Sequence, residues 1–280
     1  LIKLMSVKNV DNELGIARAL YNFALKNILS KESVDLAVNL LNSKNDNVRL
    51  LSSNLLARLK GEHLVEYAEI LLIKLEEDKN DGVRMNIATT FNKVNSNAFA
   101  SALLKRIEDQ KEVFGVKVNA INSCNYFHYE TVSSSVLKQV RSKELKIALE
   151  AVAFYENRCE RNDWIRLARM KDSITNHQLR AKIHGVLLKH AKKDEKKAIQ
   201  SHIRKSVISN ADPFVKSYYL AAMKYWDENY ISLGKWIFSG AHSVVSSQAM
   251  QSFYELSKSE SFLKNKDTND FQTKRQYFAK

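Results

Sequence analysis

The chain has 280 residues, 45% of them hydrophobic and 27% charged, which excludes a disordered polypeptide and supplies ample apolar surface for a core. It contains only 7 glycines and 1 proline, too few for the turns of a sheet-rich protein, so the composition predicts an all-α chain. A net charge of +13 is compatible with a nucleic acid, an anionic surface or an acidic protein as partner, and does not choose among them.

A repeated helical pattern runs along the chain. Each copy opens with an apolar anchor residue, and in six of the seven clear copies Arg or Lys follows the anchor directly. These helices are predicted at 48–59, 83–94, 116–127, 145–156, 179–190, 215–226 and 245–256, and an earlier copy begins at Ile16. Successive anchors lie 35, 33, 29, 34, 36 and 30 residues apart, a spacing typical of helical-repeat proteins.

Each of these helices carries one apolar face. Positions zero, four and eight after the anchor share a helical face, as in Val83, Ile87 and Phe91. A second amphipathic helix precedes each copy, predicted at 34–41, 65–75, 98–107, 132–140, 164–170, 198–207 and 230–238. Because neither helix of a pair can bury its apolar face alone, we expect the pairs to stack on one another.

Turn residues separate the two helices of each pair. Asn45, Asn80 and Asn176 precede three of the anchors, and Asp212-Pro213 precedes a fourth. Asn and Asp side chains accept hydrogen bonds from the first backbone N–H groups of a helix, and Pro is favoured at its first position. We therefore expect these residues to cap the second helix of each pair.

The Val-Arg opening after an Asp or Asn turn, as at Val48-Arg49 and Val83-Arg84, resembles the HEAT repeat. The resemblance covers nearly the whole chain and implies an all-α HEAT-like α-solenoid of about seven to eight helix pairs, with the second helix of each pair on the concave side. Ser246 departs from the pattern in the last copy. The polar run at 265–270 is followed by a new apolar start, so we interpret residues 1–280 as one α-solenoid and a piece of a longer chain.

Residues 142–260 carry a narrower resemblance. The runs 145–155, 163–168 and 177–182 are similar to the helical-repeat segment attached to some bacterial cyclophilin-type peptidyl-prolyl isomerases. The resemblance implies a substrate-holding role in the bacterial envelope, periplasmic or associated with the outer membrane; otherwise we expect a cytoplasmic location. The isomerase domain would lie outside this chain, because 7 glycines and 1 proline cannot supply its β-barrel.

The basic residues that follow the anchors form one column. They are Arg49, Arg84, Lys117, Lys146, Arg180 and Lys216. We interpret this column as an inter-repeat ladder in which each cation pairs with Asp or Asn in an adjacent turn, and Asp46 and Asp81 are placed for such pairs. The alternative is a track for phosphate groups.

A second column is predicted to face a partner. It lies three and ten residues after the anchors and includes Tyr126, Tyr155, Tyr218, Tyr225, Lys93, Lys182 and Lys189. Tyr offers a large contact area at low entropic cost, so Tyr and Lys together suit an extended peptide. Packing between repeats is the alternative. A separate basic stretch at 189–205 is either solvated helix surface or an anion-binding spot.

The sequence offers no catalytic motif. It has no H-E-x-x-H, C-x-x-C, G-x-S-x-G or Walker motif, and its two cysteines do not make a disulfide framework. We predict no cofactor, metal, small-molecule ligand or transmembrane segment. The leading hypothesis is a non-catalytic scaffold for a protein partner. A nucleic-acid-binding module is the alternative, and a HEAT-like DNA glycosylase using Asp163-Trp164 or Trp226-Asp227 is the least favoured.

Overall fold

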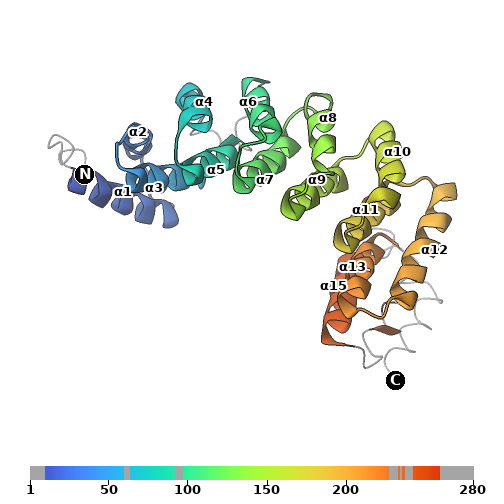
Figure 1. Ribbon diagram of the computed structural model, residues 1–280. Helices are drawn as coiled ribbons and strands as arrows, with labels where there is room; N and C mark the ends of the chain where they lie inside the picture. The colour runs from blue at the N-terminus through green and yellow to red at the C-terminus, as the bar shows by residue number, and fades with distance from the viewer. Residues whose placement is uncertain are drawn as a thin grey trace. The chain divides into compact units, whose positions relative to one another are not determined.

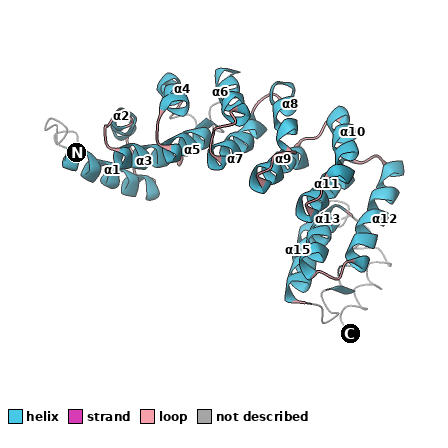
Figure 2. Ribbon diagram, in the orientation of Figure 1, coloured by secondary structure: helices cyan, strands magenta, loops and turns pink. Residues whose placement is uncertain are grey.

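The computed structural model describes residues 10–59, 64–91, 97–226, 233, 235–236 and 242–258. These residues form fourteen α-helices, four short 3-10 helices and no strand (Figure 1, Figure 2). The all-α prediction is confirmed for this part of the chain. The chain divides into two compact units, Leu1–Phe154 and Tyr155–Lys280.

The first unit is built from two rows of helices. One row holds α1 (Val10–Leu25), α3 (Asp46–Leu56), α5 (Asp81–Thr90) and α7 (Phe114–Ser123); the other holds α2 (Lys31–Leu40), α4 (Ala68–Glu77), α6 (Asn97–Glu108) and α8 (Tyr129–Gln139) (Figure 1). Two 3-10 turns, η3 (Val65–Tyr67) and η5 (Cys124–Tyr126), precede α4 and extend α7. Each α-helix of the first row packs on the next one in its row and on its partner in the other row. This nearest-neighbour packing is the repeat arrangement that the sequence predicts.

The second unit repeats the pattern. Helices α11 (His177–His190), α13 (Pro213–Ala222) and α15 (Ser243–Ser257) pack side by side, while α10 (Arg161–Met170) packs on α11 and α12 (Lys193–Ser209) packs on both α11 and α13. The 3-10 turns η6 (Lys171–Ser173) and η7 (Met223–Tyr225) extend α10 and α13. Helix α9 (Leu145–Asn157) begins in the first unit and ends in the second.

The predicted apolar stripe forms the core. Val83, Ile87 and Phe91 are all completely buried, and Val116 and Ala120 are buried in the same way one repeat later. Burying a Val, Ile or Phe side chain stabilises a fold by about 1.5–3 kcal/mol, so each repeat contributes its own share of the core energy.

The predicted helix caps are also present. Asn45 accepts a hydrogen bond from the Asn47 backbone N–H at 2.9 Å, and Asn80 accepts one from Gly82 at 2.9 Å. Asn176 and Asp212 cap α11 and α13 through Leu179 at 3.0 Å and Phe214 at 2.8 Å. Pro213 occupies the first helical position of α13. These caps fix where the second helix of each pair begins.

Two predicted segments fall largely outside the described residues. The helix expected at 230–238 is described only at 233, 235 and 236, and the polar run at 265–270 with its apolar continuation lies wholly outside.

Candidate partner-binding site

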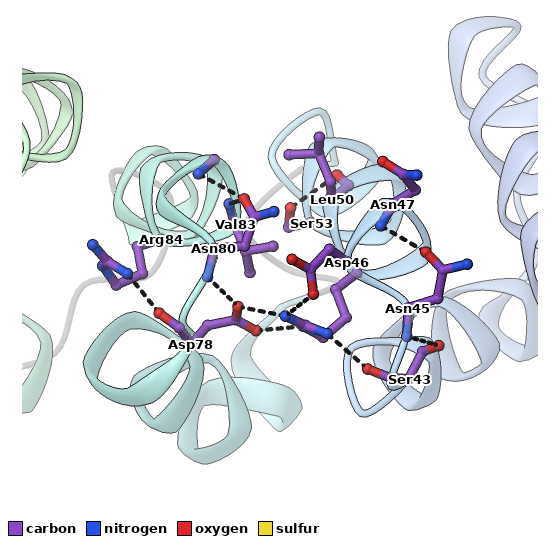
Figure 3. A network of polar contacts seen from close by, with 12 residues as sticks. Ser43, Asn45, Asp46, Asn47, Leu50, Ser53, Asp78, Asn80, Val83 and Arg84 are labelled. Carbon is purple, nitrogen blue, oxygen red and sulfur yellow. Dashed lines mark hydrogen bonds and ion pairs between the residues drawn. The ribbon is translucent and has the colours of Figure 1, made fainter.

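Arg49 joins two consecutive repeats through its guanidinium group. Its Nε and Nη2 donate to the two carboxylate oxygens of Asp78, at 2.8 and 3.1 Å, although Asp78 belongs to the next turn. Its Nη1 donates to the Ser43 carbonyl at 2.9 Å, and Nη2 also reaches Asp46 at 2.8 Å. Figure 3 shows Ser43, Asp46 and Asp78 around this group. A bidentate pair fixes orientation as well as distance, so it sets the register of the two repeats.

Arg84 repeats the arrangement one unit later. It donates to both Glu112 carboxylate oxygens at 2.7 and 3.2 Å, to the Asp78 carbonyl at 2.6 Å, and to Asp81 at 2.6 Å. The Glu112 side chain is 1% exposed and is also contacted by Arg106 at 3.3 Å. The hydrogen bonds that Arg84 donates to Glu112 raise the pKa of Arg84 despite its burial.

The sequence analysis placed Asp46 and Asp81 as the acids that join one repeat to the next. In the structure each contacts the arginine three residues on in its own helix, so these two pairs lie within one repeat. Asp78 and Glu112 were not singled out, because they lie 29 and 28 residues beyond Arg49 and Arg84. The signal that could have found them is an acid just before each turn, one repeat after each arginine.

The ladder changes character at Lys117. This residue is 6% exposed, and no hydrogen bond or ion pair engages its ammonium group among the described residues. Ser142 holds the turn position that Asp78 holds earlier: its hydroxyl accepts from the Glu144 backbone N–H at 3.2 Å, as Asp78 accepts from Asn80 at 2.9 Å. A hydroxyl therefore replaces the carboxylate at this step.

The remaining ladder residues make other contacts. The Lys146 ammonium lies 5.0 Å from the centre of the Phe114 ring, and Lys216 lies 5.4 Å from that of Trp236. Arg180 donates through Nε to the Ile174 carbonyl at 2.7 Å. In the described residues none of these three cations has an ion-pair partner, so carboxylate rungs are found only at Arg49 and Arg84.

Two of the predicted partner-facing residues, Tyr126 and Lys93, belong to the first unit. Tyr126 lies in η5 at the end of α7 and is 55% exposed. Lys93 lies outside the described residues. An exposed Tyr ring at the end of a second helix is the placement that the partner-facing interpretation requires.

Three predicted residues of the second unit converge on Glu156. The Tyr225 hydroxyl donates to Glu156 Oε1, and the Lys182 ammonium lies 3.9 Å from Oε2. Lys189 donates to the Glu156 main-chain carbonyl at 2.7 Å and lies 5.5 Å from the centre of the Tyr225 ring. Lys224, which sequence reasoning missed, donates to Oε1 at 2.9 Å. We call Glu156, Lys182, Lys189, Lys224 and Tyr225 the Glu156 cluster.

The electrostatics of this cluster favour an anion. Burial disfavours ionisation of Glu156, but hydrogen bonds from Lys224 and Tyr225 outweigh it and lower the pKa of that carboxyl. Burial, followed by the bond to Glu156, raises the pKa of the Tyr225 phenol, which therefore stays protonated and donates. Two lysines contact the carboxylate and a third donates to the Glu156 main-chain carbonyl, so the cluster retains positive charge.

The other two predicted tyrosines face inward. Tyr155 is completely buried, and Tyr218 packs against the core of the second unit. The local structure also differs. Helix α7 ends at Ser123 and is followed by the 3-10 turn that contains Tyr126, whereas α9 stays α-helical through Asn157. A partner cannot reach the Tyr155 ring in this structure.

The basic stretch at 189–205 lies mostly on α12. Lys192, Lys193, Lys197 and Lys205 are exposed, and none of them has an ion-pair partner among the described residues. Arg204 lies 5.0 Å from the centre of the Trp226 ring. This side of α12 is thus a solvated basic surface.

The described residues of the two Asp/Trp pairs that suggested a glycosylase are packed within the fold. The Trp164 indole donates to the Leu187 carbonyl at 2.9 Å and lies under Arg161, whose guanidinium is 4.4 Å from the ring centre. Asp163 is 5% exposed and pairs with Arg166 at 3.3 Å. Trp226 is 7% exposed, and Asp227 lies outside the described residues.

The cysteine and histidine side chains do not assemble a reactive centre in the described part of the chain. Burial raises the pKa of the Cys124 and Cys159 thiols to about 12, so both are protonated at neutral pH. Within the described residues no three His, Cys, Asp or Glu side chains are grouped as a metal site. The described helices also include none with the length and apolar character needed to cross a bilayer.

Comparisons with known proteins inform the fold alone. No family model matches the chain, and no curated protein matches it. Among solved structures, the crystal structure of an engineered protein is similar, with a TM-score of 0.51 and 16% identity over 98% of this chain and 85% of that one. At this identity the similarity supports an all-helical, repeat-like fold and carries no functional information.

Proposed function

We propose that this chain is a HEAT-like scaffold that binds a protein partner and performs no chemistry of its own. The observation that supports it is the Glu156 cluster, in which Lys182 and Lys224 contact the Glu156 carboxylate while Lys189 donates to the Glu156 main-chain carbonyl beside the Tyr225 ring. The side chains of Lys182 and Lys224 are 34% and 32% exposed, so a partner can reach them.

The chemistry of the cluster suits an acidic protein segment. Lysine ammonium groups attract carboxylates, and a Tyr ring adds contact area that is rigid and inexpensive in entropy. The Glu156 carboxylate is already bound by lysines of the cluster. The cluster has more lysines than this one carboxylate neutralises, so it can also bind a carboxylate of a partner protein.

A nucleic-acid partner is the second candidate, and the exposed lysines of α12 favour it. The two candidates differ in their dependence on salt and on residues. Nucleic-acid affinity falls linearly on a logarithmic salt scale as phosphate contacts release counterions. Contacts with the Glu156 cluster depend on Lys182 and Lys224 and not on α12.

The experiment compares four labelled probes by fluorescence anisotropy: an acidic peptide of alternating Glu and Ser, its Gln analogue, a single-stranded RNA and a duplex DNA. We expect the acidic peptide to bind more tightly than its Gln analogue. We also expect the double variant Lys182→Ala/Lys224→Ala to weaken its binding about tenfold. Urea denaturation of each variant verifies that the fold is retained.

The matched control is Lys193→Ala/Lys197→Ala on α12, which should change peptide affinity less than about twofold. Tight RNA or DNA binding with a steep salt dependence, lost in the α12 variant, would replace the proposed function with the nucleic-acid candidate.

A finer form of the proposal comes from the resemblance of residues 142–260 to the helical segment of some bacterial envelope isomerases. In that form the partner is an unfolded client, and the Glu156 cluster lies within the resembling segment. Sequencing the complete reading frame tests it: an adjoining cyclophilin domain and a signal peptide are expected, and their absence from the complete frame would remove this form.

A further inference from the structure

In the described residues the interrupted ladder leaves Lys117 without a carboxylate, as it does Lys146, Arg180 and Lys216. Arg49 and Arg84 each receive an acid from the following turn, Asp78 and Glu112. Lys117 occupies the same column, is 6% exposed, and has no ion pair or hydrogen bond to its ammonium in the described residues. An ammonium group that has no ion pair and lines a cavity can form a charge-assisted hydrogen bond with an anion that enters it.

The place of the missing acid is hollow. Lys117 and Ser142 line one cavity of about 630 Å³, between the turn that precedes α7 and the turn that precedes α9. Ser142 is too short and too weakly polar to replace a carboxylate, and its hydroxyl already accepts from the Glu144 backbone. The cavity is large enough for the end of an acidic side chain together with water.

The charges that line this cavity are unbalanced. Glu108 is held by Lys138 at 2.9 Å and by Ser135 at 2.7 Å, and Glu112 is held by Arg84. These carboxylates are therefore already paired.

Three further charged side chains line the cavity with Lys117. Arg141 and Lys143 are cationic, Glu144 is anionic, and no side-chain hydrogen bond or ion pair engages any of them among the described residues. Three unpaired cations thus face one exposed carboxylate.

The rim adds an aromatic contact. Phe114, the first residue of α7, lines the cavity and is 49% exposed. The Lys146 ammonium lies 5.0 Å from the centre of its ring. An exposed ring beside a basic cavity is a surface that a peptide can cover, whereas a bare inorganic anion cannot.

We propose that this cavity, the Lys117 pocket, binds a side-chain carboxylate from an acidic segment of a partner protein. The carboxylate takes the place that Asp78 and Glu112 take in the preceding rungs and pairs with Lys117, while Arg141 and Lys143 hold neighbouring acids and Phe114 packs on the peptide. The pocket lies in the first unit and is separate from the Glu156 cluster.

The experiment places the missing acid in the chain itself. Ser142→Asp should fill the pocket with an internal carboxylate, raise the urea midpoint, and weaken binding of the labelled Glu-Ser peptide about tenfold. Lys117→Met removes the cation at nearly constant side-chain size. It should weaken peptide binding to the same extent without lowering the urea midpoint, because no ion pair among the described residues is broken by the substitution.

The control is Lys79→Ala, in the corresponding turn of the Arg49 rung, where Asp78 is present. Its peptide affinity should change less than about twofold. A Ser142→Asp variant with a lower midpoint, or a Lys117→Met variant with unchanged affinity, would overturn the proposal. So would binding of inorganic phosphate at constant ionic strength without binding of the peptide.

The test separates this pocket from the proposed function. If only the Glu156 cluster binds the peptide, Lys182→Ala/Lys224→Ala weakens peptide binding and Lys117→Met does not. That result overturns the proposal for the Lys117 pocket and leaves the proposed function standing. If only the pocket binds, the pattern is reversed. If both bind, each variant weakens the peptide and the combined variant weakens it further.

Discussion

Arg84 holds two side-chain carboxylates and one main-chain carbonyl with a single guanidinium group. Replacing it with Met leaves Glu112 buried with only Arg106 as a charged partner. Removing one member of a buried pair typically costs 3–5 kcal/mol, and Arg106 offsets part of this, so we expect Arg84→Met to lower the free energy of unfolding by about 2–3 kcal/mol.

Urea denaturation measures this loss. Arg18→Met, at an exposed position of α1, is the matched control and should stay within about 0.5 kcal/mol of the wild type. Equal stability of the two variants would show that the Arg84 rung does not stabilise the stack.

His184 makes a second residue-scale prediction, for the second unit. Its ring is 1% exposed and stacks on His202 at 4.3 Å between ring centres. Nδ1 bonds the Arg180 carbonyl at 2.8 Å and therefore carries the proton, while Nε2 is buried without a partner in the described residues. Burial lowers the pKa of His184 from 6.5 to about 4. The native state thus holds this ring neutral where the unfolded chain protonates it.

The sign of the pH effect follows from this difference in pKa. The contribution of His184 to stability is complete above pH 6.5 and is lost as the pH falls toward 4, because only the unfolded chain binds the proton in that range. The loss reaches about 3 kcal/mol, and His202, whose pKa burial also lowers, acts in the same direction.

Urea midpoints measured at pH 7.5 and 4.5 test this pH dependence of stability. His184→Phe should lose about 2 kcal/mol less than the wild type over this interval, and the exposed His177→Phe on the same helix is the matched control. Identical pH dependence in the wild type and His184→Phe would contradict the assignment.

At the scale of elements, sequence patterns predicted where helices begin better than where they end. Helices α5 and α13 begin directly after Asn80 and Asp212, because these side chains accept hydrogen bonds from the first backbone N–H groups of the helix. Such capping is a local property that the residue type determines. The ends are set by packing. Helix α7 tightens into a 3-10 turn after Ser123, and α9 does not tighten at the corresponding place.

The predicted site residues differ in whether a partner can reach them. Tyr126 and Tyr155 hold the same position relative to their anchors, so a periodic pattern treats them alike. The structure exposes 55% of Tyr126 and buries Tyr155 completely. Glu156, which gathers Lys182 and Tyr225, could not be predicted, because three segments far apart in sequence bring these side chains together.

At the scale of the whole molecule, the energy of the fold is distributed along the chain. Within each unit, helices such as α3, α5, α11 and α13 pack on their sequence neighbours and on the helix one repeat away. Stability in such arrays is approximately a sum of local terms. A destabilising substitution in one repeat should therefore destabilise mainly that repeat and its neighbours. In a compact domain with a single core, the same substitution would destabilise the whole domain.

Two core substitutions, one in each unit, test this locality. Leu103 on α6 and Leu220 on α13 are both completely buried, so replacing either with Ala should cost about 2–5 kcal/mol by leaving a cavity. We expect hydrogen–deuterium exchange after Leu103→Ala to accelerate in α4 to α8 and to remain at the wild-type rate in α11 to α15, and Leu220→Ala to give the opposite pattern. Leu25→Ala, at a residue 52% exposed, should change neither region. Faster exchange in both units after a single core substitution would mean that the chain unfolds as one cooperative body, and the nearest-neighbour account of its stability would then be wrong.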